Sequence, residues 1–209
     1  MEVHTADKEL YESKFKQITD DRKALLDKCA TSISQQIEIE GKTNVVVICT
    51  HNSRRSQLGE LLTATAAHEY GVRNLHSFSG GSEATAFNYR MVNAVLRKGY
   101  CIQLLEAGEN PRYKVSLNDH QFKNEFFSKV YDHKSNPSEN FVAILVCHSA
   151  DEACPSIVGA SGRFFVPYVD PKISDDSSKE AEVYDAKVVE IGTEMFYLVN
   201  QVNSLLGRS

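Results

Sequence analysis

Several features of exported and membrane proteins are missing from this sequence. No stretch approaches the roughly 18 consecutive apolar residues of a membrane-spanning helix. The first eight residues, MEVHTADK, are polar and lack the basic and then apolar layout of a signal peptide. We therefore expect a cytoplasmic protein with no membrane partner.

Positive charge is also not in excess. The chain has 23 Lys and Arg residues against 28 Asp and Glu residues, which gives a net charge of −5, and it has no basic block. Because affinity for nucleic acids depends on many Lys and Arg contacts with phosphates, we expect no nucleic-acid partner. The 209 residues, without repeats or low-complexity segments, fit a single globular domain of residues 1–209.

Cysteine patterns of metal sites and disulfide frameworks are absent as well. The five cysteines are an odd number, and none forms a Cys-x-x-Cys pair, so we expect no structural zinc or other bound metal. Free thiols in a chain of this size are typical of a reducing compartment. Cys29 lies on the apolar face of a predicted helix and Cys101 in a strand-like run, so both are expected to be buried.

What the sequence does have is an alternation of strand-like and helix-like segments. A short, continuous β-branched run predicts a buried strand at residues 43–49, and further strands are predicted at residues 74–79, 141–147 and 164–169. Apolar residues at helical spacing predict helices at residues 56–70, 84–98 and 179–206. Because such alternation produces a parallel sheet covered on both faces, we expect an α/β fold with three layers, α/β/α, around a central four-stranded parallel sheet.

The predicted core covers residues 43–206, and two further regions are expected, one before the core and one inserted within it. Residues 1–40 are expected to be an N-terminal helical appendage, with one amphipathic helix over residues 8–40. Residues 106–140 are a polar, irregular insertion in which residues 113–117 and 126–131 are expected to pair as a hairpin. Other histidines, His120 and His133 among them, are expected on the solvated surface.

The first predicted strand leads into the sequence Cys49-Thr50-His51-Asn52-Ser53-Arg54-Arg55-Ser56. A loop between a strand and a helix points backbone N–H groups inward, and the helix N-terminus adds positive potential, so an oxyanion fits there. The same environment makes Cys49 a candidate thiolate nucleophile, and Arg55 can bind two oxygens of the transition state. The Ser56 hydroxyl can donate to the thiolate, and Asn52 suits a left-handed backbone position.

Two further segments follow predicted strands. Cys147 and Cys154 flank the sequence His-Ser-Ala-Asp-Glu-Ala and precede Pro155. In a helix the two thiols lie about 10 Å apart along the axis, so the helix must unwind before they can form a disulfide. Asp170, held in a stiff loop by Pro171, can protonate a leaving oxygen at the same sheet edge.

Each segment also has a purely structural explanation. On that view Cys49 is a buried thiol at a strand end, and Arg54 and Arg55 are surface charges. Cys147 and Cys154 are then unrelated buried thiols, and the Asp-Pro sequence marks an ordinary turn.

Taken together, the three segments resemble the low-molecular-weight protein tyrosine phosphatase superfamily, and most closely its thioredoxin-coupled arsenate reductases. The resemblance covers roughly residues 43–105 and 141–206. It implies a catalytic role for Cys49, Arg55 and Asp170. The substrate-binding residues that it implies are Thr50, His51, Asn52, Ser53, Arg54 and Ser56.

The resemblance to the reductases implies that Cys49 attacks arsenate, that Cys147 then attacks Cys49 and releases arsenite, and that Cys154 resolves the disulfide for a thioredoxin-like reductant. The alternative is a phosphatase that hydrolyses phosphotyrosine or small phosphoesters through a phosphocysteine, with Cys147 and Cys154 as a redox guard. A binding module without activity is disfavoured because Cys49, Arg55 and Asp170 are all present.

The sequence departs from the family pattern at three positions. His51 replaces the usual glycine of the loop, Arg54 replaces a common second cysteine, and Lys172 replaces the aromatic residue that follows Asp-Pro in tyrosine phosphatases. No organic cofactor is implied. In some reductases a potassium ion lies near the loop, and the matching positions here are Asn52, Glu60 and Ser79.

Overall fold

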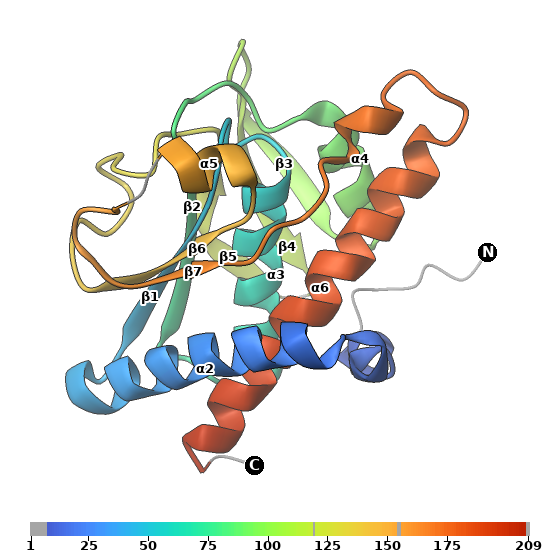
Figure 1. Ribbon diagram of the computed structural model, residues 1–209. Helices are drawn as coiled ribbons and strands as arrows, with labels where there is room; N and C mark the ends of the chain where they lie inside the picture. The colour runs from blue at the N-terminus through green and yellow to red at the C-terminus, as the bar shows by residue number, and fades with distance from the viewer. Residues whose placement is uncertain (1–7, 119, 154–155, 208–209) are drawn as a thin grey trace.

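The computed structural model describes residues 8–118, 120–153 and 156–207. Its centre is a four-stranded parallel sheet with the strand order β2-β1-β6-β7 (Figure 1). The four strands are β1 Thr43–Cys49, β2 Leu75–Gly81, β6 Phe141–Leu145 and β7 Ala160–Phe165. Residues 45–48 and 142–145 of the two inner strands are fully buried, which explains their continuous apolar sequence. The predicted α/β class and central parallel sheet are confirmed.

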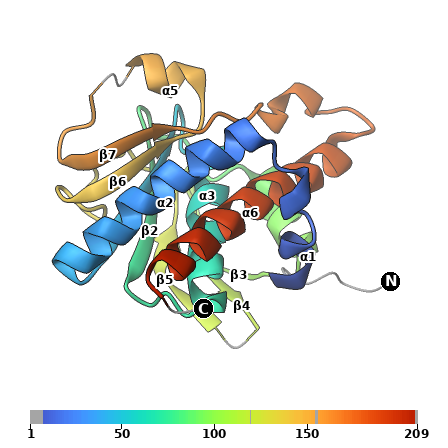
Figure 2. The same ribbon diagram turned by 60° about the horizontal axis from the view of Figure 1, so that its bottom comes forward.

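Helices flank this sheet. They are α2 Asp20–Glu40, α3 Arg55–Glu69, α4 Tyr89–Arg97, α5 His148–Ala153 and α6 Glu180–Leu205. Helix α3 packs on β1 and β2, and Gly59 permits this approach because a Cβ there would lie 2.6 Å from a methyl carbon of Val47. Figure 2 shows α2 lying beside α6, and these two helices are in contact. No described helix has the length and hydropathy needed to cross a membrane.

The N-terminal region is not one helix and not an appendage. A short helix α1 (Lys8–Glu12) and a 3-10 turn (Phe15–Gln17) precede α2, and Thr19 caps α2 by accepting a hydrogen bond from the Arg22 amide. The Tyr11 ring is fully buried against Phe196 of α6, with ring centroids 4.4 Å apart. The prediction of a single helix over residues 8–40 is wrong, because the Thr-Asp-Asp sequence at residues 19–21 is itself a helix start.

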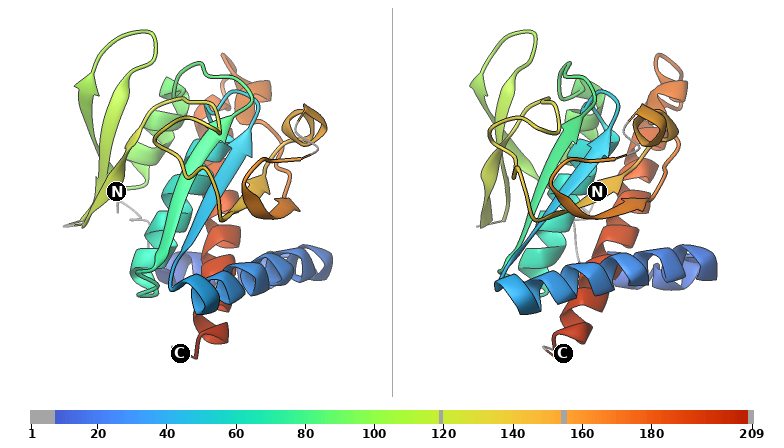
Figure 3. Two further views of the ribbon diagram at one scale, coloured as in Figure 1. Left: turned by 90° about the vertical axis from the view of Figure 1, so that its left-hand side faces the viewer. Right: turned by 60° about the vertical axis from the view of Figure 1, so that its left-hand side comes forward.

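Much of the predicted irregular insertion is regular structure. Strands β3 Cys101–Glu106, β4 Arg112–Leu117 and β5 His120–Phe126 form an antiparallel sheet of their own, with β4 in the middle. Figure 3 shows this second sheet standing to one side of the central one. Since β3 is an edge strand with an exposed surface, Cys101 is exposed, and the prediction that it is buried is wrong. Cys29 is buried as predicted.

Three strand predictions needed correction at their ends, and the first is that β6 ends at Leu145 and not at residue 147. The fourth strand lies at residues 160–165 and not at 164–169, and β2 continues through Gly80 and Gly81, which pair with Ile48 and Cys49 of β1. A Cβ on Gly81 would lie 2.5 Å from the Thr50 carbonyl oxygen. Glycine is therefore required where β2 passes the loop after β1.

Candidate active site

The loop that joins β1 to α3, residues 49–56, is hereafter called the anion loop. Its backbone carbonyl groups accept hydrogen bonds from the surrounding segments. The Cys49 carbonyl accepts from the Ser82 amide, the Thr50 carbonyl from the Glu83 amide, and the Ser53 carbonyl from the Asn88 amide. The His51 carbonyl accepts from the hydroxyls of Thr85 and Ser128. No backbone N–H of residues 50–54 donates to another group in the part of the chain that the structure describes. The amides of the anion loop are thus left to a bound anion.

Asn52 sets the shape of the anion loop. Its φ angle of 44° is left-handed, as the sequence predicts, and its side chain is fully buried. The Asn52 Nδ2 donates to Ser56 Oγ at 2.8 Å, and its Oδ1 accepts from the Lys129 amide at 2.9 Å and from Gln57 Nε2 at 3.1 Å. These buried bonds from three directions offset the cost of the left-handed backbone.

Cys49 lies at the base of this loop. Its Sγ is 3.0 Å from Ser56 Oγ. Because Ser56 already accepts a hydrogen bond from Asn52, its single hydroxyl proton is free to point at the sulfur. The chain Asn52–Ser56–Cys49 therefore directs a donor at Cys49, which stabilises a thiolate.

Arg55 and Asp170 meet above the loop. Arg55 Nη1 donates to the Tyr168 carbonyl at 2.9 Å, and Nη2 donates to Asp170 Oδ2 at 2.7 Å. The Arg55 Nε is buried and has no hydrogen-bond partner among the described residues. An oxyanion in the loop would supply the acceptor that this buried N–H lacks.

Arg54 is engaged with the loop that carries Asp170, and its Nε lies 3.9 Å from Asp170 Oδ1. Its Nε donates to the Tyr184 hydroxyl at 2.9 Å, and its Nη2 lies 3.4 Å from Asp175 Oδ2. Burial and the hydrogen bond to Asp175 raise the pKa of Tyr184 to about 12, so Tyr184 remains a protonated donor. The Arg54 side chain thus holds the loop after Asp170, and its contact with a substrate stays a prediction.

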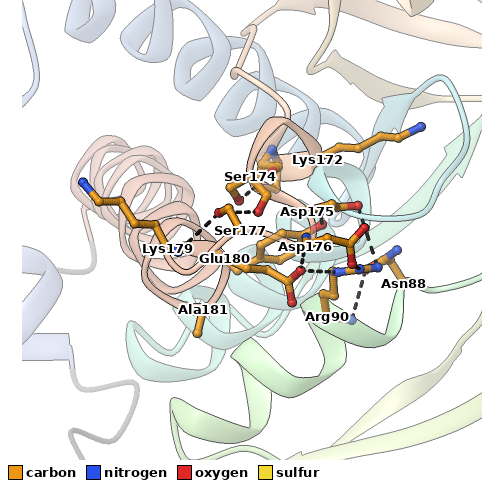
Figure 4. Close-up of polar contacts among 12 residues, drawn as sticks. Asn88, Arg90, Lys172, Ser174, Asp175, Asp176, Ser177, Lys179, Glu180 and Ala181 are labelled. Carbon is orange, nitrogen blue, oxygen red and sulfur yellow. Dashed lines mark hydrogen bonds and ion pairs between the residues drawn. The ribbon is translucent and has the colours of Figure 1, made fainter.

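That loop is also tied to α4 and α6, as Figure 4 shows. Arg90 donates to Glu180 Oε2 at 2.7 Å and to Asp176 Oδ1 at 2.5 Å, and the Asp176 amide donates to Glu180 at 2.7 Å. Asp176 has a left-handed φ of 62°. The Arg90 contacts lower the pKa of Glu180. The loop that carries Asp170 is thus anchored at its far end by a cluster of ion pairs.

The remaining predicted residues surround the loop. Cys147 is buried at the end of the segment after β6, and its Sγ lies 3.3 Å from Thr50 Oγ1. Cys154 lies outside the described residues, so its pairing with Cys147 and the predicted unwinding remain predictions. Ser53 is buried, whereas His51 is half exposed at the mouth, with Nε2 3.7 Å from a Glu83 carboxylate oxygen.

The residues that match a potassium site do not fit a potassium ion. The buried Glu60 carboxylate accepts from Ser79 Oγ at 2.6 Å and from Asn124 Nδ2 at 2.8 Å, and the Lys129 ammonium lies 3.7 Å from it. Asn52 Oδ1 is already used by two N–H donors. The lysine therefore supplies the positive charge that a cation would bring, and the donors occupy the oxygens that it would need. No group of three metal-ligating side chains occurs among the described residues.

Sequence reasoning missed the residues that hold the loop from outside. Ser128 and Lys129, both from the supposedly irregular insertion, contact His51 and Asn52 across 77 positions of sequence. Single polar residues so far from the motif carry no local signal, because only the folded chain brings them together.

Comparison with known proteins agrees with this architecture. No protein-family model and no curated protein matches the sequence. A low-molecular-weight phosphotyrosine phosphatase from Vibrio cholerae O395 matches 76% of this chain and 95% of its own, with a TM-score of 0.52 and 13% identity. A mutant of YwlE from Bacillus subtilis matches 78% and 99%, with a TM-score of 0.53 and 17% identity. A YwlE arginine phosphatase mutant with a phosphorylated active-site serine matches 77% and 96%, with a TM-score of 0.52 and 16% identity. The chain has the fold of the low-molecular-weight protein tyrosine phosphatases.

Proposed function

We propose that this protein is a cysteine-dependent phosphatase that hydrolyses phosphate monoesters through a phosphocysteine. The observation that carries this proposal is the anion loop, in which every carbonyl of residues 49–53 is bonded outward and the amides of residues 50–54 remain free. Such a cradle binds a tetrahedral oxyanion directly above the Cys49 sulfur.

In this proposal the Cys49 thiolate attacks phosphorus. The bond to the leaving oxygen breaks, its electron pair stays on that oxygen, and Asp170 supplies the proton. Arg55 stabilises the charge on the equatorial oxygens. Water then cleaves the sulfur–phosphorus bond and releases phosphate. The phosphorylated active-site serine in the matched YwlE mutant supports a covalent phosphoenzyme on the equivalent fold.

The experiment is hydrolysis of p-nitrophenyl phosphate by the wild type and by Cys49→Ser, with Cys101→Ser as the matched control at an exposed thiol. We expect Cys49→Ser to be inactive and Cys101→Ser to keep full activity. Brief reaction followed by acid quench and mass spectrometry should detect a phosphate adduct on Cys49. Full activity in Cys49→Ser would overturn the proposal.

A second candidate is arsenate reduction, favoured by the position of Cys147 beside the anion loop at 3.3 Å from Thr50 Oγ1. Here the Cys49 thiolate forms a bond to arsenic while one arsenate oxygen leaves as water with a proton from Asp170. The Cys147 thiolate then attacks the Cys49 sulfur. The sulfur–arsenic electron pair leaves with arsenic, which is reduced to arsenite while the two thiols are oxidised to a disulfide. Cys154 and a thioredoxin-like reductant would then restore the thiols in a reducing, cytoplasmic compartment.

A further inference from the structure

A cavity of about 520 Å³ lies away from the anion loop, between helix α3, the outer edge of β2 and strand β5. Strand β5 belongs to the second sheet, which stands to one side of the central one (Figure 3). Its volume is within the range of about 300–1,000 Å³ that is usual for small-molecule sites. The proposed phosphatase reaction makes no use of it.

The walls of this cavity combine aromatic and aliphatic surface. Phe122 and Phe126 come from β5, Leu75 and Phe78 from β2, and Ala64 from α3. Phe122 and Phe126 are almost fully buried, because they also contribute to the core. A planar apolar group in the cavity therefore packs mainly on Phe78 and Ala64, which are only partly buried.

Positive charge surrounds the same cavity. Arg73 and Lys123 line it and are exposed, and neither side chain has an ion-pair partner among the described residues. Burial and the nearby charges of Lys123 and Lys42 lower the pKa of His76, which also lines the cavity. The uncompensated lysines thus create a positive potential at the half-buried imidazole.

Histidine rings extend this wall. His120 stacks on His68 with ring centroids 3.8 Å apart, and both line the cavity. His120 is half-buried, so the prediction that it lies on the solvated surface is wrong. Burial and the neighbouring His68 lower the pKa of His120, and the nearby Glu69 carboxylate opposes this shift.

The one acidic residue among the described lining residues is Glu60, and its carboxylate is already used. Ser79 and Asn124 donate to it, and Lys129 lies beside it. Glu60 therefore does not offset the charges of Arg73 and Lys123 at the cavity mouth.

The edge of β2 beside the cavity is not open to an added peptide strand. Asn124 Nδ2 donates to the Ser77 carbonyl at 2.8 Å, and Asn136 Nδ2 donates to the Ser79 carbonyl at 2.9 Å. Because strand addition needs these carbonyls as acceptors, the two asparagines block it. A compact ligand that fills the cavity fits better than an extended chain.

We propose that this cavity is a second binding site, distinct from the anion loop, for a small molecule with a planar apolar body and one anionic group. The apolar body packs between Phe122, Phe78 and the α3 surface. The anionic group lies toward Arg73, Lys123 and His76.

The test is a titration of the full-length protein with 2-naphthoate at low salt, followed by the Cε1–H signals of its histidines in carbon-edited NMR spectra. His76 and His120 should shift saturably, whereas His51 at the anion loop should not. His76→Gln assigns the His76 signal. Neutral 2-naphthamide, which has the same body without the charge, should bind at least about fivefold more weakly.

Two variants separate charge from shape. Lys123→Gln should weaken 2-naphthoate about threefold to tenfold, while Lys28→Gln, an exposed lysine on α2, should leave the affinity unchanged. Ala64→Leu keeps every charge but fills the cavity, and it should weaken 2-naphthoate and 2-naphthamide alike. Thermal unfolding of each variant checks that it remains folded.

Three outcomes would overturn the proposal. They are the absence of a saturable shift at His76 and His120, equal affinity for 2-naphthoate and 2-naphthamide, and a shift confined to His51. If neither Lys123→Gln nor Ala64→Leu changes the affinity for 2-naphthoate, this cavity is also excluded as the site.

Discussion

The Asp170 carboxylate is held by the guanidinium of Arg55, with Oδ2 2.7 Å from Nη2. This pair joins the two groups that the proposed reaction needs for different tasks. Because an oxyanion in the anion loop competes for Arg55, substrate binding would release Asp170 to act as a proton donor. Without substrate, the ion pair holds the Arg55 and Asp170 side chains together.

From this relationship we predict that Asp170→Asn slows hydrolysis according to the leaving group. Turnover of phenyl phosphate should fall about 10²–10⁴-fold, since its leaving oxygen needs a proton, and turnover of p-nitrophenyl phosphate should fall less. Steady-state kinetics with both substrates checks this. An equal loss for the two would assign Asp170 a structural role only.

The two candidate functions differ in their use of Cys147 and Cys154. If arsenate is the substrate, Cys154→Ser should accumulate a Cys49–Cys147 disulfide after one turnover, and catalytic reduction should stop. Hydrolysis of p-nitrophenyl phosphate by the same variant should continue. Thiol mapping by mass spectrometry after stoichiometric arsenate is the measurement, with Cys101→Ser as the control. If Cys147 enters no disulfide, arsenate reduction is excluded and the phosphatase remains.

Asn52 should matter through both its side chain and its backbone. Asn52→Gly loses the buried hydrogen bonds and should destabilise the fold by about 1–3 kcal/mol. Asn52→Ala adds the strain of a left-handed non-glycine residue, so it should be less stable than Asn52→Gly by about 1–2 kcal/mol. Urea unfolding measures both free energies. Asn140→Ala, at an exposed left-handed position with φ of 53°, is the control for backbone strain alone.

The cluster that anchors the loop after Asp170 predicts a pH effect. Arg90 lowers the pKa of Glu180 in the folded state, so ionised Glu180 stabilises the fold. That contribution is fully present above the unfolded pKa of about 4.3 and is lost as the pH falls through the folded value. We expect Glu180→Gln to reduce the fall in unfolding free energy below about pH 4.3. Glu182→Gln, an exposed neighbour, should behave like the wild type in urea unfolding at each pH.

The N-terminal and insertion regions show where local patterns mislead. The apolar spacing of residues 8–40 is helical throughout, yet Thr19 starts a new helix because its side chain caps the amides that follow. Phe122 and Phe126 of strand β5 have a clear structural role only once β5 is paired with β4 and forms a wall of the cavity. For such segments the decisive partners are distant in sequence, so their pattern alone is ambiguous.

The sequence by itself determined the central strands, the anion loop with Cys49 and Arg55, and the left-handed position of Asn52. It could do so because β-branched runs, a strand-to-helix loop and a φ preference are local properties. Tertiary structure alone decided that Lys129 lies beside Glu60, that Arg54 binds Tyr184 and Asp175, and that Cys147 reaches Thr50. These contacts join residues 69 to 130 positions apart. They form only when the folded chain brings the polar groups within reach of one another.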